Sequence, residues 1–167
     1  MWRAAIVLVL FLSQPAMAAE REWGLAFARG ADSADTDVVR LTYRHPLKEN
    51  GAWWMPAQLQ YGVGLWRVPD IRGTTRRFDL SVTPVWRTEV PWGYAEAGIG
   101  IYLLSKTINN DDTRVPSSLE FGSHIGTGVR LSKAATVGFA VQHLSNAGIK
   151  QPNGGINLYM ITTNFTW

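Results

Sequence analysis

The sequence contains no cysteine, which excludes a disulfide framework and leaves the redox state of its compartment open. It also lacks metal-ligand spacings, phosphate-binding glycine loops and cofactor fingerprints. The pair Gly98-x-Gly100 is not such a glycine loop, because it falls within an expected strand. We therefore expect neither a metal nor a cofactor. The formal net charge is only +3, and the basic residues are scattered along the chain, so nucleic acid is not an expected partner.

Long hydrophobic runs are missing after residue 18, where no stretch approaches the ~20 residues that a membrane-spanning helix needs. The one apolar stretch, residues 4–12, follows the basic Arg3 and precedes Ala16-Met17-Ala18, a small-residue cleavage pattern. These features predict a secretory signal peptide at residues 1–18 and a single domain at residues 19–167. If the mature protein enters a membrane, it must do so with strands.

The mature chain shows a period of two in its hydrophobic residues almost throughout. The sequence has 16 glycines and 8 tryptophans, and it is rich in the β-branched and aromatic residues that favour strands. One face of each segment is apolar, and the other carries Gly, Gln, Thr and isolated charges. The pattern predicts about eight strands, at residues 23–28, 39–44, 57–65, 78–86, 95–103, 119–131, 136–145 and 157–167.

Two arrangements fit eight such strands, an outer-membrane barrel with its apolar face toward lipid and a secreted lipocalin-like barrel with that face inside. Aromatic residues near segment ends are typical of the interfacial girdles of the first arrangement. The final residues, which end on Trp167, also resemble the C-terminal strand signal of bacterial outer-membrane proteins. We therefore predict an all-β, eight-stranded antiparallel transmembrane β-barrel. The girdle residues expected from the sequence are Trp23, Trp66, Trp86, Trp92 and Trp167.

Barrel topology assigns each connection to one side of the membrane. With the N-terminus in the periplasm, the extracellular connections are residues 30–37, 67–76, 105–117 and 146–156, and the periplasmic turns are residues 45–52, 88–93 and 132–135. The strand at 136–145 therefore ends at the extracellular rim of a Gram-negative outer membrane, where the leaflet is lipopolysaccharide.

That strand carries the main candidate for chemistry. Val137, Phe139, Val141, His143 and Ser145 share one face, which is the apolar, lipid-facing one. An imidazole beside a serine hydroxyl can activate it as a nucleophile. The spacing alone is a weak signal, because two polar residues at a membrane rim are also a common structural feature.

A second histidine is expected to have a structural role. His124 falls on the inward face of its segment together with Glu120 and Arg130. We expect these three residues to form a polar network inside the barrel.

The stretch from His143 to Ile156, with the sequence HLSNAGIKQPNGGI, resembles the signature of the PagL family of lipid A 3-O-deacylases. Residues 96–100 and 117–121 resemble the family as well, whereas the first half of the chain does so only in architecture. The resemblance implies a serine esterase that hydrolyses the 3-position ester of lipid A in the outer leaflet. It further implies His143 as general base, Ser145 as nucleophile, and the Asn146 side chain and Gly148 N–H as oxyanion donors.

The chain departs from the family at one catalytic position. The resemblance places a glutamate twelve residues after the serine, where this sequence has Asn157, and no acidic residue follows Glu120. An amide can still orient a histidine through its carbonyl oxygen. The alternatives to the deacylase are a non-catalytic structural, adhesion or inactive barrel and another lipid A-modifying barrel enzyme, such as a palmitoyltransferase. The expected partners are lipid A or lipopolysaccharide and outer-membrane lipids, and whether the barrel forms a homodimer stays open.

Overall fold

The protein is represented by a computed structural model that describes residues 21–31, 36–47, 56–70, 73–109, 114–115, 117–151 and 153–167. The signal peptide predicted at residues 1–18 lies outside the described residues, so the structure does not test it. In the described ranges, no helix is long and apolar enough to cross a membrane.

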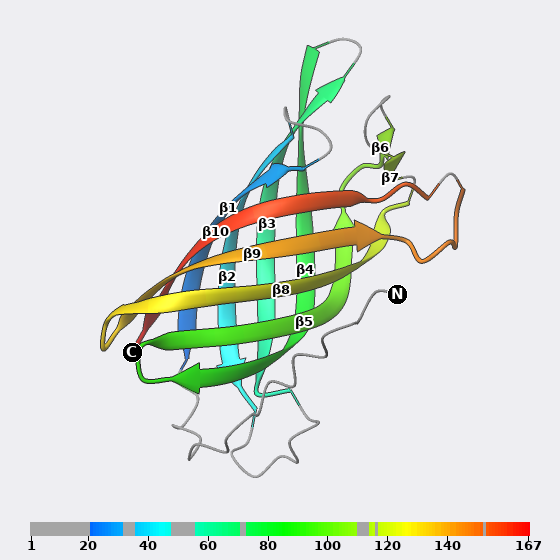
Figure 1. The fold of residues 1–167 in the computed structure, drawn as a ribbon. Helices are drawn as coiled ribbons and strands as arrows, with labels where there is room; N and C mark the ends of the chain where they lie inside the picture. The colour runs from blue at the N-terminus through cyan, green and yellow to red at the C-terminus, as the bar shows by residue number, and fades with distance from the viewer. Residues whose placement is uncertain are drawn as a thin grey trace, which may run out of the picture.

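Eight antiparallel strands close into a barrel, which confirms the fold class predicted from the alternation (Figure 1). Around the barrel the order is β1-β10-β9-β8-β5-β4-β3-β2, so that the first and last strands pair with each other. A two-stranded hairpin, β6–β7, lies within the long connection between β5 and β8 and was not predicted. The strands are β1 (Glu22–Gly30), β2 (Asp37–Pro46), β3 (Gln58–Asp70), β4 (Gly73–Val90), β5 (Gly93–Leu104), β6 (Ile108–Asn109), β7 (Arg114–Val115), β8 (Leu119–Ser132), β9 (Ala135–Ser145) and β10 (Ile156–Thr166).

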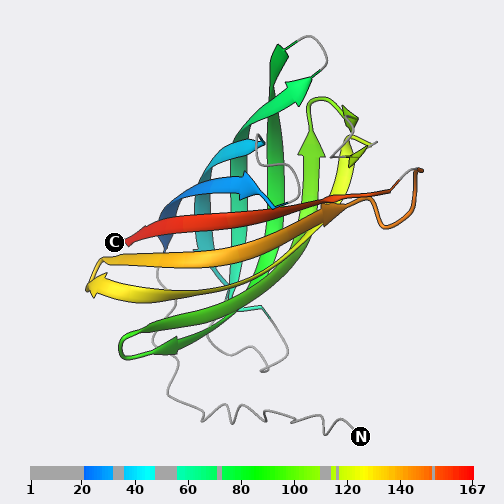
Figure 2. The ribbon, with the colours of Figure 1, turned by 45° about the horizontal axis from the view of Figure 1, so that its top comes forward.

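The connections differ between the two ends of the barrel. Two-residue turns join β4 to β5 and β8 to β9 at the end where the chain terminates, and the loop after β9 lies at the opposite end (Figure 2). The β3–β4 connection differs from the predicted loop at 67–76, because the two strands stay paired as far as Asp70 and Gly73. Gly73, with φ 114°, allows the chain to reverse there. The connection from β2 to β3 is longer than predicted and spans residues 47–57.

Side chains alternate strictly between the outer wall and the interior, as the burial pattern of β1 (BeBeBeBeB) shows. The outer wall is apolar, and large hydrophobic side chains such as Leu25, Val63 and Ile101 are about half exposed there. Aromatic rings meet at the end of the wall that carries the short turns, where Trp23 contacts Tyr43 at 5.1 Å between ring centroids and Trp167 at 6.3 Å. This arrangement is typical of an interfacial aromatic girdle.

One predicted girdle residue, Trp66, is placed wrongly by the sequence analysis. Its side chain points into the barrel, is 1% exposed, and donates its indole N–H to Asp79. The error has a simple cause, because proximity to a strand end was weighted above parity. Leu65 faces outward, so its neighbour Trp66 has to face inward.

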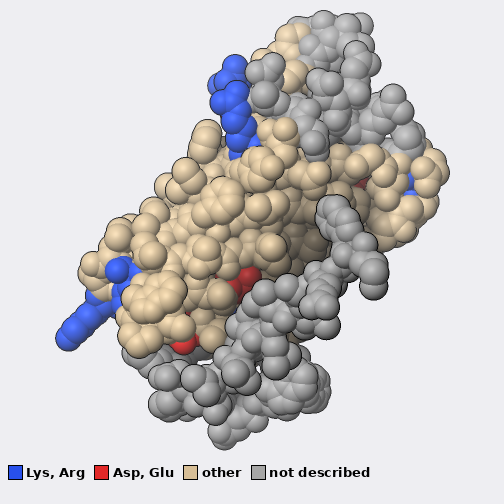
Figure 3. Space-filling model, viewed as in Figure 1, with Lys and Arg blue, Asp and Glu red and all other residues tan. Residues whose placement is uncertain are grey.

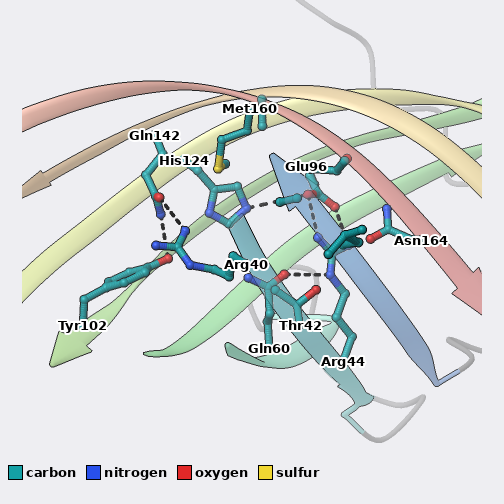
Figure 4. A pocket seen from close by; sticks show the side chains of 14 residues that line it. Arg40, Thr42, Arg44, Gln60, Glu96, Tyr102, His124, Gln142, Met160 and Asn164 are labelled. Atoms are coloured by element: carbon teal, nitrogen blue, oxygen red, sulfur yellow. Dashed lines mark hydrogen bonds and ion pairs between the residues drawn. The ribbon is translucent and has the colours of Figure 1, made fainter. Parts of the chain in front are cut away.

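The interior holds a network of buried charges in the half of the barrel near the aromatic girdle. Arg44 donates two hydrogen bonds to Glu96, at 2.8 and 2.9 Å, and one to Gln60 (Figure 4). Arg87 forms an ion pair with Glu22 at 2.9 Å. These side chains leave a cavity of about 30 Å³, so this part of the lumen is filled rather than open.

His124 lies inside the barrel as predicted, but its partners are different. Its Nε2 lies 3.7 Å from Glu96, whereas Glu120 accepts a hydrogen bond from Ser117 and Arg130 donates to Glu89. The alternation of side chains along a strand predicts whether a residue faces the interior, but its height along the barrel decides which side chains it contacts.

The interior toward the opposite end is apolar and closely packed. Fully buried hydrophobic side chains from the barrel strands and from the β6–β7 hairpin form one cluster, which includes Trp66, Val68, Leu104, Ile108, Val115, Leu144, Ile156 and Leu158. Because the described residues fill both halves of the interior, a site for a large ligand has to lie on the outer wall or among the loops.

Candidate active site

His143 and Asn157 face each other across the β9–β10 pair. The register places the two residues directly opposite each other, and both side chains point outward. His143 Nδ1 lies 2.8 Å from Asn157 Oδ1, which is hydrogen-bond distance. Two positions fourteen residues apart in sequence are therefore brought into contact by strand pairing alone.

With Asn157 Oδ1 as the acceptor, this contact selects one tautomer of the neutral imidazole. A carbonyl oxygen can only accept a hydrogen bond, so Nδ1 must carry the proton. Nε2 of the neutral ring is then left with its lone pair and can accept a proton from a hydroxyl group. An imidazole held in this way has the tautomer that a general base requires.

Ser145 lies two residues beyond His143 on the same outward face of β9 and is half-buried. Its partner across the β8–β9 pair is Phe121. In the part of the chain that the structure describes, the Ser145 hydroxyl makes no hydrogen bond, and rotation about χ1 decides what it approaches. Catalytic hydrogen bonds are often formed only once substrate is bound.

The segment that follows Ser145 is organised by Asn146, whose side chain is fully buried. Its Nδ2 donates to the Lys150 carbonyl at 2.9 Å, and its Oδ1 accepts from the Gly148 N–H at 3.0 Å. Ala147 and Gly148 both have positive φ, 53° and 81°, which produces the tight turn. The two groups expected to stabilise an oxyanion are therefore bonded to each other in this arrangement.

Gly155 lies beside His143, a contact that the sequence analysis did not predict. Its φ is 67°, and a Cβ built there would lie 2.6 Å from the Leu144 carbonyl oxygen and 2.9 Å from Cε1 of His143. The glycine backbone thus packs directly against the imidazole ring and leaves no room for a side chain. The Gly-Gly pair in the sequence was the available signal, but nothing in it indicated contact with the histidine.

Ser123 is a second serine beside the histidine and was also missed. It pairs with His143 across the β8–β9 register and is exposed on the outer face. His143 is therefore flanked by Ser123 on one side and by Asn157 on the other. A serine in the middle of an apolar segment gave no signal of its own.

The wall next to these polar residues is apolar. Phe139 on β9 and Tyr159 on β10 stack with their ring centroids 6.1 Å apart, on the girdle side of the His143–Asn157 pair. Ile125 on β8 and Ile161 on β10 are 68% and 60% exposed on the same wall. An ester positioned at Ser145 could therefore lay its acyl chain along this wall. Among the described residues, no group of three or more His, Asp or Glu side chains could hold a metal ion.

Comparisons with known proteins show the family to which the chain is related. The family model described as lipid A 3-O-deacylase (PagL) matches residues 37–166. A protein named lipid A deacylase PagL from Bordetella bronchiseptica is 34% identical over 136 residues, which cover 76% of this chain and 74% of the relative. One of the same name from Pseudomonas aeruginosa is 43% identical over 89 residues, which cover 51% of each chain.

A solved structure gives the same result for the fold. The crystal structure of the outer membrane enzyme PagL superposes with a TM-score of 0.71 at 26% sequence identity. The superposition covers 87% of this chain and 99% of that structure.

Proposed function

Because the chain belongs to the PagL family of lipid A 3-O-deacylases, we propose that it hydrolyses the acyl ester at position 3 of lipid A on the outer wall of the barrel. The observation that carries the proposal is the 2.8 Å contact between His143 and Asn157. His143 lies two residues before the outward-facing Ser145 on the same strand. The fold is that of an outer-membrane barrel. The lipid A ester would meet Ser145 at the headgroup boundary while its acyl chain stays in the bilayer.

The reaction that this geometry supports has two steps. In the first, Ser145 Oγ attacks the ester carbonyl carbon as His143 Nε2 takes the hydroxyl proton. The C–O bond to the sugar then breaks, the sugar oxygen receives the proton from the imidazolium, and the acyl group stays on Ser145. In the second step, water gives a proton to Nε2 and attacks the acyl-serine, which releases the fatty acid and restores the hydroxyl.

Asn157 acts in this scheme as a positioning residue. Its carbonyl oxygen accepts the Nδ1 proton of His143 and so leaves Nε2 unprotonated as the base for the serine hydroxyl. The oxyanion donors are Asn146 Nδ2 and the Gly148 N–H, which we infer turn toward the substrate oxygen when the ester binds. That step exchanges the Gly148–Asn146 hydrogen bond for one to the oxyanion, which is the stronger interaction because the acceptor is charged.

The test is the mass spectrum of lipid A from cells that express the wild type, Ser145→Ala or Ser123→Ala. We expect the wild type and Ser123→Ala to remove one 3-hydroxyacyl group, and Ser145→Ala to remove none. All three proteins should keep the heat-modifiable migration of a folded barrel. This pair of variants is matched, because both serines lie on the outer wall close to the same histidine.

Other results would contradict the proposal in distinct ways. Full deacylation by Ser145→Ala would exclude Ser145 as the nucleophile, and loss of activity only in Ser123→Ala would transfer that role to the neighbouring strand. A gain in lipid A mass would indicate an acyltransferase. An unchanged spectrum with a folded wild type would indicate a barrel without this activity.

A further inference from the structure

The outer wall carries a row of charged side chains that the deacylase reaction does not use. Arg29 on β1 pairs with Asp37 on β2, Asp37 pairs with Arg67 on β3, and Arg67 pairs with Arg76 on β4. The strand register thus aligns three arginines and one aspartate in a single line around the barrel. Arg67 and Asp37 lie 3.5 Å apart, and the Arg67 side chain is 67% exposed.

Each of these charges lies near the loop end of its strand, where we expect the lipid headgroups. A basic side chain on the lipid-facing wall costs about 2–4 kcal/mol at the bilayer midplane but only about 0–1 kcal/mol near the interface. From this row to the aromatic girdle, the described outward side chains of β1 and β3 carry no charge. In Figure 3 the visible wall is tan over most of its height, and Lys and Arg atoms project at its upper and lower ends.

Arg29 is the member of the row nearest to the candidate active site. It pairs with Tyr159 on β10, which in turn pairs with Val141 on β9, two residues before His143. Ala31, two residues after Arg29 and just beyond the end of β1, donates its N–H to the carbonyl oxygen of Asn157 at 2.8 Å. With strands about 4.8 Å apart, Arg29 therefore lies roughly 10 Å around the wall from the strand that carries His143 and Ser145.

We propose that Arg29 binds a phosphate group of the same lipid A molecule whose 3-position ester meets Ser145. The inference rests on the proposed function, since it names a second contact for that substrate. Lipid A is a phosphorylated sugar lipid, and a guanidinium group recognises phosphate through paired, charge-assisted hydrogen bonds. The separation of about two strands suits a substrate whose phosphate and ester lie on one sugar backbone.

Arg76 provides a matched control. It stands in the same register row and is exposed on the same outer face, but it lies three strands beyond Arg29, roughly 14 Å farther around the wall. A lipid A molecule that is placed for reaction at Ser145 cannot reach it. A specific contact at Arg29 and a diffuse attraction between basic residues and anionic lipid therefore predict different behaviour for these two arginines.

The binding arm of the experiment uses Ser145→Ala as the parent, so that bound lipid is not consumed. Purified protein in neutral detergent is titrated with bisphosphorylated lipid A and with enzymatically dephosphorylated lipid A. We expect Arg29→Gln to raise the Kd for the bisphosphorylated lipid about tenfold, to leave the Kd for the dephosphorylated lipid unchanged, and to be partly rescued by Arg29→Lys. Arg76→Gln should behave like the parent toward both lipids.

The kinetic arm uses the same Arg29 and Arg76 substitutions with Ser145 intact. Arg29→Gln should raise KM for bisphosphorylated lipid A with little change in kcat, and the heat-modifiable migration should be that of the wild type. If the wild type releases no fatty acid, the proposed function fails, and the binding arm still decides the role of Arg29. Equal affinity of Arg29→Gln and its parent, an equal loss for both lipids, or an equal loss for Arg76→Gln would each overturn the inference.

Discussion

At the residue scale, Asn157 bonds to His143 through a neutral oxygen. Such a contact orients the ring and fixes its tautomer, but it adds no negative charge next to the imidazolium that forms during the reaction. A carboxylate at the same place would do both. The family resemblance implies a glutamate at this position, so in the proposed reaction an amide takes the place of an acid.

We predict that Asn157→Glu raises kcat by about tenfold or more, because the carboxylate stabilises the imidazolium as well as orienting it. Asn157→Ala should lower kcat at least about 100-fold with little change in KM, since the imidazole ring then loses the Asn157 oxygen that accepts from Nδ1. Fatty acid release from purified lipid A measures both parameters. The register contact leaves room for a longer side chain, because Asn157 lies on the outer face rather than in the packed interior.

Two results would remove Asn157 from this role. One is an Asn157→Ala protein with the kcat of the wild type, and the other is an Asn157→Glu protein that has lost activity while it stays folded. Phe165→Leu, a substitution near the other end of the same outward face of β10, is the control for general effects on the strand.

At the element scale, the strands and the loop that follows β9 differ in how well the sequence predicts them. Alternation on β9 predicts that His143 and Ser145 share the outer wall, and the structure confirms this placement. The period of two cannot give the bonds of Asn146 and Gly148, which depend on consecutive positive φ angles and on a carbonyl four residues away. Nor could it give the approach of Gly155 to His143, because that contact depends on where the loop rejoins β10.

Strand register was also beyond the reach of the sequence. The contact between His143 and Asn157 requires knowledge of which residues pair across β9 and β10, whereas parity alone only places both on the outer face. The family resemblance gave Asn157 as the third residue of the candidate site, and strand pairing places this residue directly opposite His143. The misplacement of Trp66 shows the converse, because there parity gave the correct inward face and proximity to the strand end was misleading.

The loop after β9 yields a prediction about Asn146. Its Nδ2 now holds the Lys150 carbonyl, and we expect it to contribute a hydrogen bond to the oxyanion during the reaction. Asn146→Asp keeps an oxygen that can accept from Gly148 but loses the amide donor. We expect kcat to fall about 10²–10³-fold in Asn146→Asp and in Asn146→Ala, in line with the loss of one oxyanion donor.

Steady-state kinetics on detergent-solubilised lipid A would measure this effect. Full activity of Asn146→Asp would show that the amide donor is not needed and that Asn146 serves only to shape the loop. Gln151→Ala, an exposed position in the same loop, is the control for changes in loop mobility.

At the scale of the whole molecule, stability and chemistry are located in different parts of the barrel. The candidate site lies on the outer wall at the end of β9, whereas the buried ion pairs of Arg44, Glu96, Glu22 and Arg87 lie inside the half near the aromatic girdle. An apolar cluster fills the interior between them and the loop end. A change in the lumen can therefore weaken the barrel without touching the groups that meet the lipid.

Glu96→Ala tests this separation. The substitution removes the carboxylate that accepts two hydrogen bonds from Arg44, so the buried guanidinium group loses part of its balancing negative charge. We expect the free energy of unfolding to fall by about 3 kcal/mol. Urea titration followed by the heat-modifiable gel shift would measure the loss, and Glu89→Gln, at a more exposed pair, should cost much less. Because Glu96 faces the lumen and His143 faces the lipid, kcat per folded molecule should stay within about twofold of the wild type. A large fall in kcat with unchanged stability would mean that the lumen network acts on the outer wall, and the two ends of the barrel would then have to be treated as one coupled unit.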